Sequence, residues 1–237
     1  TLLLLRRMGL ESHHDQAQLA CKALLDGGFR QNGSICYAKS KDVTDHGVTG
    51  MILALLSYFD YPDDRVQVIA GYLISQQMEN GSWEPYPGNQ ETKYTFAATL
   101  LCLDALWEYE KRYPEQYVAV REAQARGREF LLEHRIYQHQ QTKAIVDPKF
   151  TLFSFPPRWY YDVLTALDYL RCCHAERDDR FCDAVGLLKK KQNPDGTWNL
   201  QNRHTGKTFF EMETVGKPSR WNTLRAIRVL KWWENSS

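Results

Sequence analysis

Two kinds of predicted helix alternate along the chain, and this alternation limits the fold more than any other feature of the sequence. The first kind is amphipathic, with its apolar residues on one face, and is predicted over 14–25, 63–77, 115–134 and 178–191. The second kind is apolar on nearly every side and is predicted over 46–60, 92–111, 158–174 and 219–233. Because a helix that is apolar on all sides is buried on all sides, the second kind must form an inner layer and the first an outer layer. Alternation with a period of roughly 50 to 65 residues therefore predicts an all-α fold, an α/α toroid with two concentric layers of helices.

The composition is that of an ordinary globular protein. Hydrophobic residues make up 43% of the 237 residues, and 30 Lys and Arg stand against 29 Asp and Glu. This near-neutral balance argues against a nucleic-acid-binding protein. The opening apolar run, 2–5, is too short to span a membrane and is followed by Arg6 and Arg7, the reverse of the order in a signal peptide. Six cysteines without C-x-x-C spacing favour a reducing compartment, so we expect a cytoplasmic protein.

The N-terminal segment is interpreted by aligning the chain with itself. A shift of 50 residues places Leu2–Leu5 on Ile52–Leu55, inside a predicted inner helix. Segment 1–10 is therefore predicted to be a partial inner helix, which gives about 4.5 helix pairs in a single domain over 1–237. Such a toroid is either open or preceded by further helices. We expect the uncovered apolar side of 1–10 to favour self-association.

Two predicted outer helices end in the same pattern, Q-x-x-x-G-x-W, at Gln77–Trp83 and at Gln192–Trp198. A degenerate copy of the pattern is predicted at Leu25–Phe29 in the first repeat. The Asn-Gly and Asp-Gly pairs inside the two full copies supply the left-handed residue that ends a helix, and the aromatic ring folds back over the exposed end. We therefore expect both tryptophans to be structural residues.

These patterns resemble the QW motifs of the squalene-hopene cyclase and protein prenyltransferase superfamily, whose members have a terpenoid cyclase-like α/α toroid. The resemblance covers the whole chain at the level of its repeats. Residues 151–237 also resemble bacterial proteins labelled squalene-cyclase-like or prenyltransferase-like, a label that carries a fold and no assigned reaction. The resemblance implies a central cavity that binds an apolar or isoprenoid-type ligand, with a cyclisation or a transfer as the reaction that such a cavity would support.

The segments that enter the inner helices form the candidate site, because in a toroid they surround the mouth of the cavity and helix N-termini direct partial positive charge toward it. Each segment combines aromatic rings, which attract cations, with ionisable groups, which can transfer protons. The predicted catalytic residues are Asp45, Glu91 and Asp162. The predicted ligand-binding residues are Asp42, His46, Tyr94, Arg158, Trp159, Tyr161, Arg220 and Trp221. We expect all of them to converge on one pocket; the alternative is that they are helix caps, core residues and ion pairs.

The segment Asp42–Asp45 resembles the D-x-D-D acid motif of class II terpene cyclases. The proton donor of that family is the third position, which is Thr44 here, and a threonine cannot protonate an alkene. The departure argues against standard protonation-initiated cyclisation unless another acid, such as Glu91, substitutes. It favours helix capping as the role of the segment.

No metal or cofactor is expected. A zinc site like that of protein prenyltransferases would need Asp45, His46 and Cys102, but Cys102 lies well inside a helical pattern, where a buried thiol is the simpler interpretation. The sequence also lacks a Gly-rich phosphate loop, a G-x-S-x-G turn and a DDxxD motif.

Segment 135–157 interrupts the repeat where a third QW motif is missing. Its apolar composition predicts that it packs against the fold, either as a structural strap or as a lid over the cavity. Three functions are open on this sequence: an enzyme acting on an apolar substrate, a non-catalytic scaffold that binds a small molecule or a peptide, and an interaction module.

Overall fold

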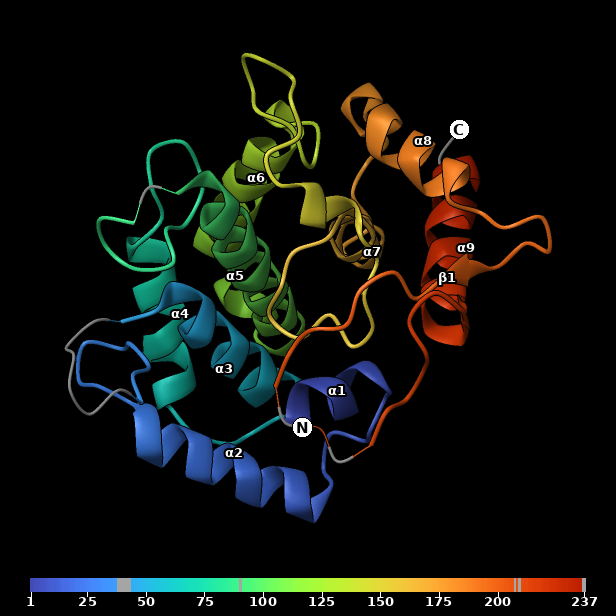
Figure 1. Cartoon of the computed structure of the whole chain (residues 1–237). Helices are drawn as coiled ribbons and strands as arrows, with labels where there is room; N and C mark the ends of the chain where they lie inside the picture. The colour runs from blue at the N-terminus through green and yellow to red at the C-terminus, as the bar shows by residue number, and fades with distance from the viewer. Residues whose placement is uncertain (38–43, 90, 207, 209, 236–237) are drawn as a thin grey trace. The chain divides into compact units, whose positions relative to one another are not determined.

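The structure is a computed structural model that describes all residues except 38–43, 90, 207, 209 and 236–237, and it is mostly helical (Figure 1). This confirms the main feature of the predicted all-α class. Two short strands are the exception among the described residues. Strands β1 (Trp198–Asn199) and β2 (Pro218–Ser219) form an antiparallel pair in which Trp198 lies opposite Ser219. This short pair joins the segment after the fourth predicted outer helix, 178–191, to the start of the last helix.

The chain divides into two compact units, Thr1–Phe130 and Leu131–Ser237. The helices of unit 1 are α1 (Leu2–Arg7), α2 (Asp15–Gly28), α3 (His46–Tyr58), α4 (Arg65–Ser75), α5 (Thr92–Arg112), a 3-10 turn (Pro114–Gln116) and most of α6 (Tyr117–Glu133). Unit 2 holds the end of α6, the 3-10 turns Pro148–Thr151 and Asp179–Phe181, and helices α7 (Val163–Cys172), α8 (Cys182–Lys190) and α9 (Arg220–Asn235).

Helices α3 and α5 lie side by side at the centre of unit 1. Two glycines of α3, Gly47 and Gly50, allow this close approach: a Cβ atom at Gly50 would lie 3.0 Å from the carbonyl oxygen of Leu101. Both helices are buried along most of their length, as predicted for 46–60 and 92–111. Their packing supplies the largest part of the apolar core of this unit.

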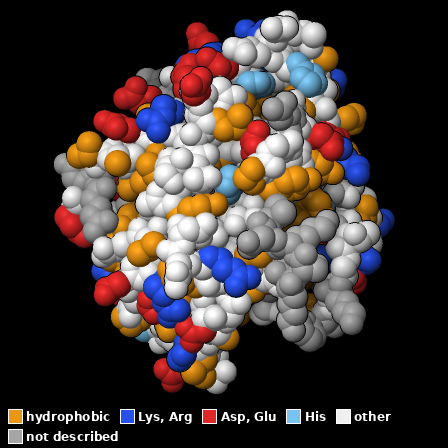
Figure 2. Space-filling view, turned by 90° about the vertical axis from the view of Figure 1, so that its left-hand side faces the viewer, with side chains coloured by type: hydrophobic (Ala, Val, Ile, Leu, Met, Phe, Trp, Pro, Cys, Tyr) orange, Lys and Arg blue, Asp and Glu red, His pale blue; other side chains and the backbone are white. Residues whose placement is uncertain are grey.

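Helices α2 and α4 are buried on one face only, as predicted for amphipathic outer helices. Cys21 and Leu25 of α2 are fully buried, whereas Leu19 on the same helix is 62% exposed. In α4, Ile69 is fully buried and Val68 is exposed. The face of the molecule shown in Figure 2 has the same mixed character, with small groups of hydrophobic side chains between charged ones.

Helix α1 packs on α3, and its leucines are only partly covered. Arg6 extends from α1 to α5, where its guanidinium lies 2.6 Å from Asp104 and 2.8 Å from Glu108. The charge and hydrogen bonds of these carboxylates raise the pKa of Arg6 despite its burial. An ion pair therefore holds α1 in place, a contact that the apolar pattern did not predict.

Helix α7 begins later than predicted. Residues 158–162 precede it as a turn, so the helix predicted over 158–174 starts at Val163. Pro156 and Pro157 cannot continue a helix, and Arg158 has a φ of 52°, in the left-handed region. The residues predicted at an inner-helix start thus lie in a loop ahead of the helix.

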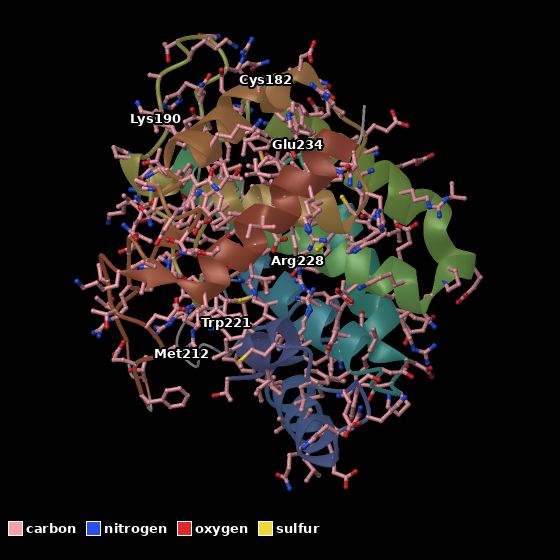
Figure 3. The ribbon with its side chains drawn as sticks, turned by 90° about the vertical axis from the view of Figure 1, so that its right-hand side faces the viewer. Cys182, Lys190, Met212, Trp221, Arg228 and Glu234 are labelled. Atoms are coloured by element: carbon pink, nitrogen blue, oxygen red, sulfur yellow. The ribbon has the colours of Figure 1, made fainter. Side chains whose placement is uncertain are left out.

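Helix α9 is buried on one face and not on all sides, which corrects the prediction for 219–233. Ala226 and Val229 are fully buried, but Leu224 and Ile227 are exposed. Figure 3 shows this helix, with Trp221 near its start and Glu234 near its end. Within unit 2 it pairs with α7 and with the short sheet.

Segment 135–157 belongs to unit 2. Within it, Phe150, Phe153 and Phe155 are buried, while Ile145, which forms an isolated bridge with Gln138, is exposed. None of the described helices has the length and apolar character needed to cross a membrane.

Candidate functional site

One four-residue turn occurs three times in the described part of the chain. We call Asn32–Ile35, Asn80–Trp83 and Asp195–Trp198 the first, second and third repeat turns. In each, the side-chain oxygen of the first residue accepts the backbone N–H of the third. The second residue is a glycine with φ between 83° and 90°, where other residues are strained. The degenerate copy predicted at Leu25–Phe29 is therefore misplaced, since Leu25–Gly28 belong to α2 and the turn follows at Asn32–Ile35.

A threonine of the following helix binds each repeat turn. The backbone N–H of the fourth turn residue donates to the hydroxyl of Thr49 in α3 at 3.2 Å, of Thr99 in α5 at 3.0 Å and of Thr223 in α9 at 3.0 Å. Each hydrogen bond therefore connects a repeat turn to the N-terminal part of a helix that is predicted to belong to the inner layer. The sequence analysis missed these threonines, although each follows a repeat turn at the start of an apolar helix.

The two tryptophans of the repeat turns have equivalent environments. Trp83 and Trp198 are fully buried. Their indole nitrogens donate to the carbonyl oxygens of Leu73 at 2.7 Å and Leu188 at 2.8 Å, in the outer helices α4 and α8. These contacts are those expected of structural residues.

Asp45 begins α3 as its N-cap. A carboxylate oxygen of Asp45 accepts the backbone N–H of Val48 at 3.0 Å. Thr44, at the position of the family's proton donor, donates to the hydroxyl of Ser34 in the first repeat turn at 3.1 Å. Asp42 lies outside the described residues. In the described part of the acid-like motif, Asp45 therefore caps α3 and Thr44 binds the first repeat turn.

His46 is buried at the first residue of α3, and only one of its ring nitrogens has a partner. Nδ1 lies 2.8 Å from the carbonyl oxygen of Glu84, so it is the nitrogen that donates. Burial lowers the pKa of His46, although the bond to Glu84 and the charge of Asp45 oppose the shift. The ring is therefore neutral at pH 7. Its Nε2 is buried and has no hydrogen-bond partner in the part of the chain that the structure describes.

Glu91 and Tyr94, at the start of α5, are on the surface. The side chain of Glu91 is 62% exposed and lies 3.0 Å from the ammonium group of Lys93. That ammonium group also lies 4.7 Å from the centre of the Tyr94 ring. Glu91 is therefore an exposed carboxylate that is paired with Lys93.

Asp162 is buried ahead of α7 and accepts four hydrogen bonds. One oxygen accepts the backbone N–H and the hydroxyl of Thr165 at 2.7 and 2.8 Å, which caps the helix. The other oxygen accepts the backbone N–H and the hydroxyl of Ser154 at 3.2 and 2.9 Å. Because both carboxylate oxygens are occupied by neighbouring donors, this geometry favours a structural acceptor over a proton donor.

A histidine missed by the sequence analysis joins this network. Nε2 of His204 lies 3.0 Å from the hydroxyl of Ser154. Because that hydroxyl donates its one proton to Asp162, the imidazole must be the donor in this contact. Tyr160 stacks on His204 with ring centres 3.8 Å apart, and Trp159 stacks on Tyr160 at 5.4 Å. No local pattern could have indicated His204, which is 50 positions from Ser154.

The remaining predicted residues ahead of α7 differ in exposure. Trp159 is 47% exposed, whereas Tyr161 is buried and donates its hydroxyl to the carbonyl oxygen of Ile136. Burial raises the pKa of Tyr161, which therefore keeps its proton. Arg158 donates to the carbonyl oxygen of Thr205 at 2.7 Å.

At the start of α9, Arg220 is exposed and Trp221 is partly buried. Arg220 lies 3.7 Å from a carboxylate oxygen of Glu213. The ring of Trp221 stacks on Phe155, with centres 5.0 Å apart and planes at 11°. Its indole nitrogen is buried and has no partner among the described residues. This donor and Nε2 of His46 are two unpaired polar atoms on predicted ligand-binding residues.

Proximity within each unit is thus shown for some of the predicted residues. Asp45 and His46 are adjacent in unit 1, and Arg158 through Asp162 form one loop in unit 2. Convergence of all of them on a single pocket stays a prediction.

The three residues considered for zinc are used in other ways. Cys102 donates a weak hydrogen bond to the carbonyl oxygen of His46 at 3.5 Å. Burial, assisted by the charge of Asp45, raises the pKa of the Cys102 thiol well above its usual value, which opposes the thiolate that zinc requires. Among the described residues, no three His, Cys, Asp or Glu side chains are grouped to hold a metal ion.

A scan against protein-family models and a search of curated proteins find no match to this chain. Its function is therefore inferred from its residues and their geometry.

Proposed function

We propose that this protein is a terpenoid cyclase-like helical-repeat protein that binds an apolar, isoprenoid-type ligand carrying a polar group. One observation carries the proposal. Two predicted ligand-binding residues, His46 and Trp221, each keep a buried ring nitrogen without a partner in the described part of the chain. An unpaired buried polar group costs about 1–3 kcal/mol, which a suitable polar group of a ligand would offset.

The chemistry of the two nitrogens specifies complementary polar groups. Nε2 of neutral His46 can accept a hydrogen bond from a hydroxyl, whereas the indole N–H of Trp221 can donate one to a hydroxyl or phosphate oxygen. The stacked rings of Trp221 and Phe155 offer an apolar, polarisable surface for a hydrocarbon chain. Within unit 2, an isoprenoid alcohol or diphosphate would offer an oxygen to the indole N–H of Trp221 and a hydrocarbon chain to the stacked rings.

The repeat turns support the toroid part of the proposal. All three have the same backbone geometry, and each is bound by a threonine of the helix that follows it, in α3, α5 and α9. Such equivalence favours one structural repeat used several times, as an α/α toroid of about 4.5 helix pairs requires.

The proposed function is binding alone, because none of the three predicted catalytic carboxylates is placed as a proton donor. Asp45 and Asp162 are occupied as helix caps, and Glu91 is exposed beside Lys93. Catalysis of a cyclisation or transfer is therefore an outcome to be tested and not part of the proposed function.

We also propose a cytoplasmic location. The six cysteines lack C-x-x-C spacing, and Cys21, Cys36 and Cys102 are buried. Buried cysteines without such spacing fit a reducing compartment. Cell fractionation that finds the protein outside the cytoplasm would contradict this part of the proposal.

Calorimetric titration with farnesol and farnesyl diphosphate tests ligand binding. We expect at least one to bind, and we expect His46→Phe and Trp221→Phe to weaken the affinity about tenfold, the effect of one lost polar contact. The matched controls are His13→Phe at an exposed histidine and Trp232→Phe in the same helix as Trp221. Failure of both ligands to bind, or unchanged affinity in both variants, overturns the proposal.

Mass spectrometry of the recovered ligand addresses catalysis in the same samples. An unchanged ligand supports a binding protein. A cyclised or transferred product would instead show an enzyme, and the variants Asp45→Asn, Glu91→Gln and Asp162→Asn would then identify the acid.

A further inference from the structure

His204 lies where two distant segments of unit 2 meet. Ser154 forms an isolated parallel bridge with Asn202, and the backbone N–H of Gln201 donates to the carbonyl oxygen of Phe153 at 2.9 Å. These bonds align the segment before α7 with the segment after β1. The alignment places the imidazole of His204 within 3.0 Å of the Ser154 hydroxyl.

A chain of hydrogen bonds fixes which nitrogen of His204 carries the proton. One carboxylate oxygen of Asp162 accepts the hydroxyl of Ser154 at 2.9 Å, so the hydroxyl oxygen is left to accept from Nε2 of His204. In the neutral ring, Nδ1 is therefore the nitrogen with the lone pair. Nδ1 has no hydrogen-bond partner in the part of the chain that the structure describes. A carboxylate and a hydroxyl thus orient a ring whose basic nitrogen is free to accept a proton.

The surroundings keep this ring neutral and hold it in place. Burial lowers the pKa of His204; the charge of Asp162 opposes this shift, and the charges of Arg158 and Lys149 add to it. The ring is therefore unprotonated at pH 7. Tyr160 stacks on it with ring centres 3.8 Å apart. A neutral, immobilised imidazole with a fixed proton is the form that acts as a general base.

A cation lies beside this base. The guanidinium of Arg158 donates to the carbonyl oxygen of Thr205, the residue after His204, at 2.7 Å. The same guanidinium approaches the backbone of Gly206 so closely that a Cβ atom there would lie 2.6 Å from its Nη1. A fixed positive charge at this place stabilises negative charge that develops on a reacting oxygen.

Two aromatic rings of the same loop give a surface for an aromatic group. Trp159 stacks on Tyr160 with ring centres 5.4 Å apart, and the two residues are 47% and 39% exposed. Exposed, stacked rings attract a further ring through dispersion and edge-to-face contacts. The base, the cation and the rings are all contributed by unit 2.

We propose that His204 is the general base of a hydrolytic site that cleaves carboxylic esters of aromatic alcohols. Nδ1 takes a proton from water, and the water oxygen forms a bond to the carbonyl carbon of the ester. The bond from that carbon to the aryl oxygen then breaks, and the aryl oxygen leaves with the electron pair and takes up the proton held on Nδ1. An aryl oxygen leaves readily as an anion, so this cleavage needs no second acid.

The other residues have distinct parts in this proposal. Arg158 faces the negative charge on the carbonyl oxygen, whereas Ser154 and Asp162 are positioning residues that act through His204. Ser154 is not the nucleophile, because it is 2% exposed and its proton is donated to Asp162. This inference does not depend on the proposed isoprenoid ligand.

Steady-state release of 4-nitrophenolate from 4-nitrophenyl acetate by the full chain tests the proposal. We expect the rate above buffer hydrolysis to fall about tenfold or more in His204→Gln, because general-base catalysis contributes about 10²–10⁴-fold. The matched control is His13→Gln, at an exposed histidine, which should keep the wild-type rate. In the wild type, kcat should decrease as the pH falls from about 7.5 to 5.5, since a protonated Nδ1 accepts no proton. A wild type that releases no more nitrophenolate than buffer overturns the proposal, as does a wild-type rate in His204→Gln.

Two further variants separate positioning from substrate binding. Ser154→Ala removes the acceptor for the Nε2 proton, so kcat should fall while KM changes little. Trp159→Ala should raise KM and leave kcat nearly unchanged. Thermal melts ensure that only folded protein is compared. An unchanged kcat in folded Ser154→Ala contradicts its positioning role, and an unchanged KM in Trp159→Ala contradicts the choice of aromatic esters.

Discussion

The hydroxyl of Thr99 accepts a hydrogen bond of 3.0 Å from the backbone N–H of Trp83, sixteen positions earlier in the chain. The same bond joins Thr223 to Trp198 in unit 2. Each bond links the end of an outer segment to the first turns of a helix predicted to be inner. A single hydroxyl therefore fixes the register between the two parts of a repeat.

Replacement of this hydroxyl should destabilise the fold. Thr99→Val keeps the shape of the side chain but leaves the buried N–H of Trp83 unpaired, so we expect a loss of about 1–3 kcal/mol in the free energy of unfolding. Thr223→Val should lower it by a similar amount. Denaturant unfolding measures both, with Thr142→Val in an exposed loop as the control. Wild-type stability in Thr99→Val would show that the bond contributes nothing.

The tryptophans of the second and third repeat turns should matter through packing more than through their N–H groups. Trp83→Ala removes a fully buried indole, and we expect it to cost about 3–5 kcal/mol. Trp83→Phe retains most of the packing and loses the bond to Leu73, so its cost should be clearly smaller. Trp198→Ala and Trp198→Phe should destabilise the fold in the same order. Trp159→Ala, at a tryptophan that is 47% exposed, is the control and should cost least. Equal melting temperatures for Trp83→Ala and Trp159→Ala would contradict the structural role.

Asp162 should prove to be a structural acceptor. Asp162→Asn replaces one acceptor oxygen by a donor group that faces the N–H and O–H groups of Ser154 or Thr165, so we expect a loss of at least about 2 kcal/mol in stability. Ser154→Ala removes one of the four bonds and should cost less. Asp147→Asn at an exposed 3-10 cap is the control. An Asp162→Asn protein as stable as the wild type would point instead to a carboxylate kept for function.

The ion pair between α1 and α5 should make stability sensitive to acid. Burial alone would raise the pKa of Asp104, but the charge and hydrogen bond of Arg6 outweigh it and hold that pKa below its ordinary value of 3.8. A carboxyl with a lowered pKa in the folded state stabilises the fold above its ordinary pKa, and this contribution is lost as the pH falls through the lowered value. Asp104→Asn should therefore flatten the acid side of the stability curve. Arg6→Met should cost about 2–3 kcal/mol at neutral pH, since it removes the charged partner of the part-buried Asp104 and leaves Glu108 paired with Lys111 alone. An unchanged acid slope in Asp104→Asn would exclude this pair as the source.

Helix positions could be predicted because they follow from local patterns. The apolar run of α3 and the one-sided pattern of α4 give their type and their bounds within about two residues. The start of α7 could not be placed in the same way, because the apolar pattern continues through Arg158 while the positive φ of that residue breaks the helix. The first repeat turn was placed too early because its aromatic residue is replaced by Ile35, whereas Gly27 and Gly28 of α2 imitate the pattern.

Less of the candidate site than of the helices could be predicted from the sequence. Asp45 and Asp162 could be predicted as helix caps, since a cap and its partner are three residues apart. The contact of His204 with Ser154 joins residues 50 positions apart, and only the folded chain brings them together. Unpaired atoms such as Nε2 of His46 are also set by surroundings that no spacing in the sequence reveals.

His46 should make the protein less stable as the pH falls below neutrality. Burial lowers the pKa of His46 in the folded state from its ordinary value of 6.5, whereas in the unfolded chain the ring takes up a proton near that value. The unfolded state therefore binds more protons below about pH 6.5, and the free energy of unfolding decreases with falling pH until the lowered pKa is reached. His204 is shifted in the same direction, by its burial, and adds to the slope. Urea unfolding between about pH 7.5 and 5.5 should show a shallower slope for His46→Gln and for His204→Gln than for the wild type, while the exposed control His13→Gln should keep the wild-type slope. The comparison uses slopes, so a general loss of stability in either variant does not affect it, and a wild-type slope in both variants would show that neither ring resists protonation in the folded chain.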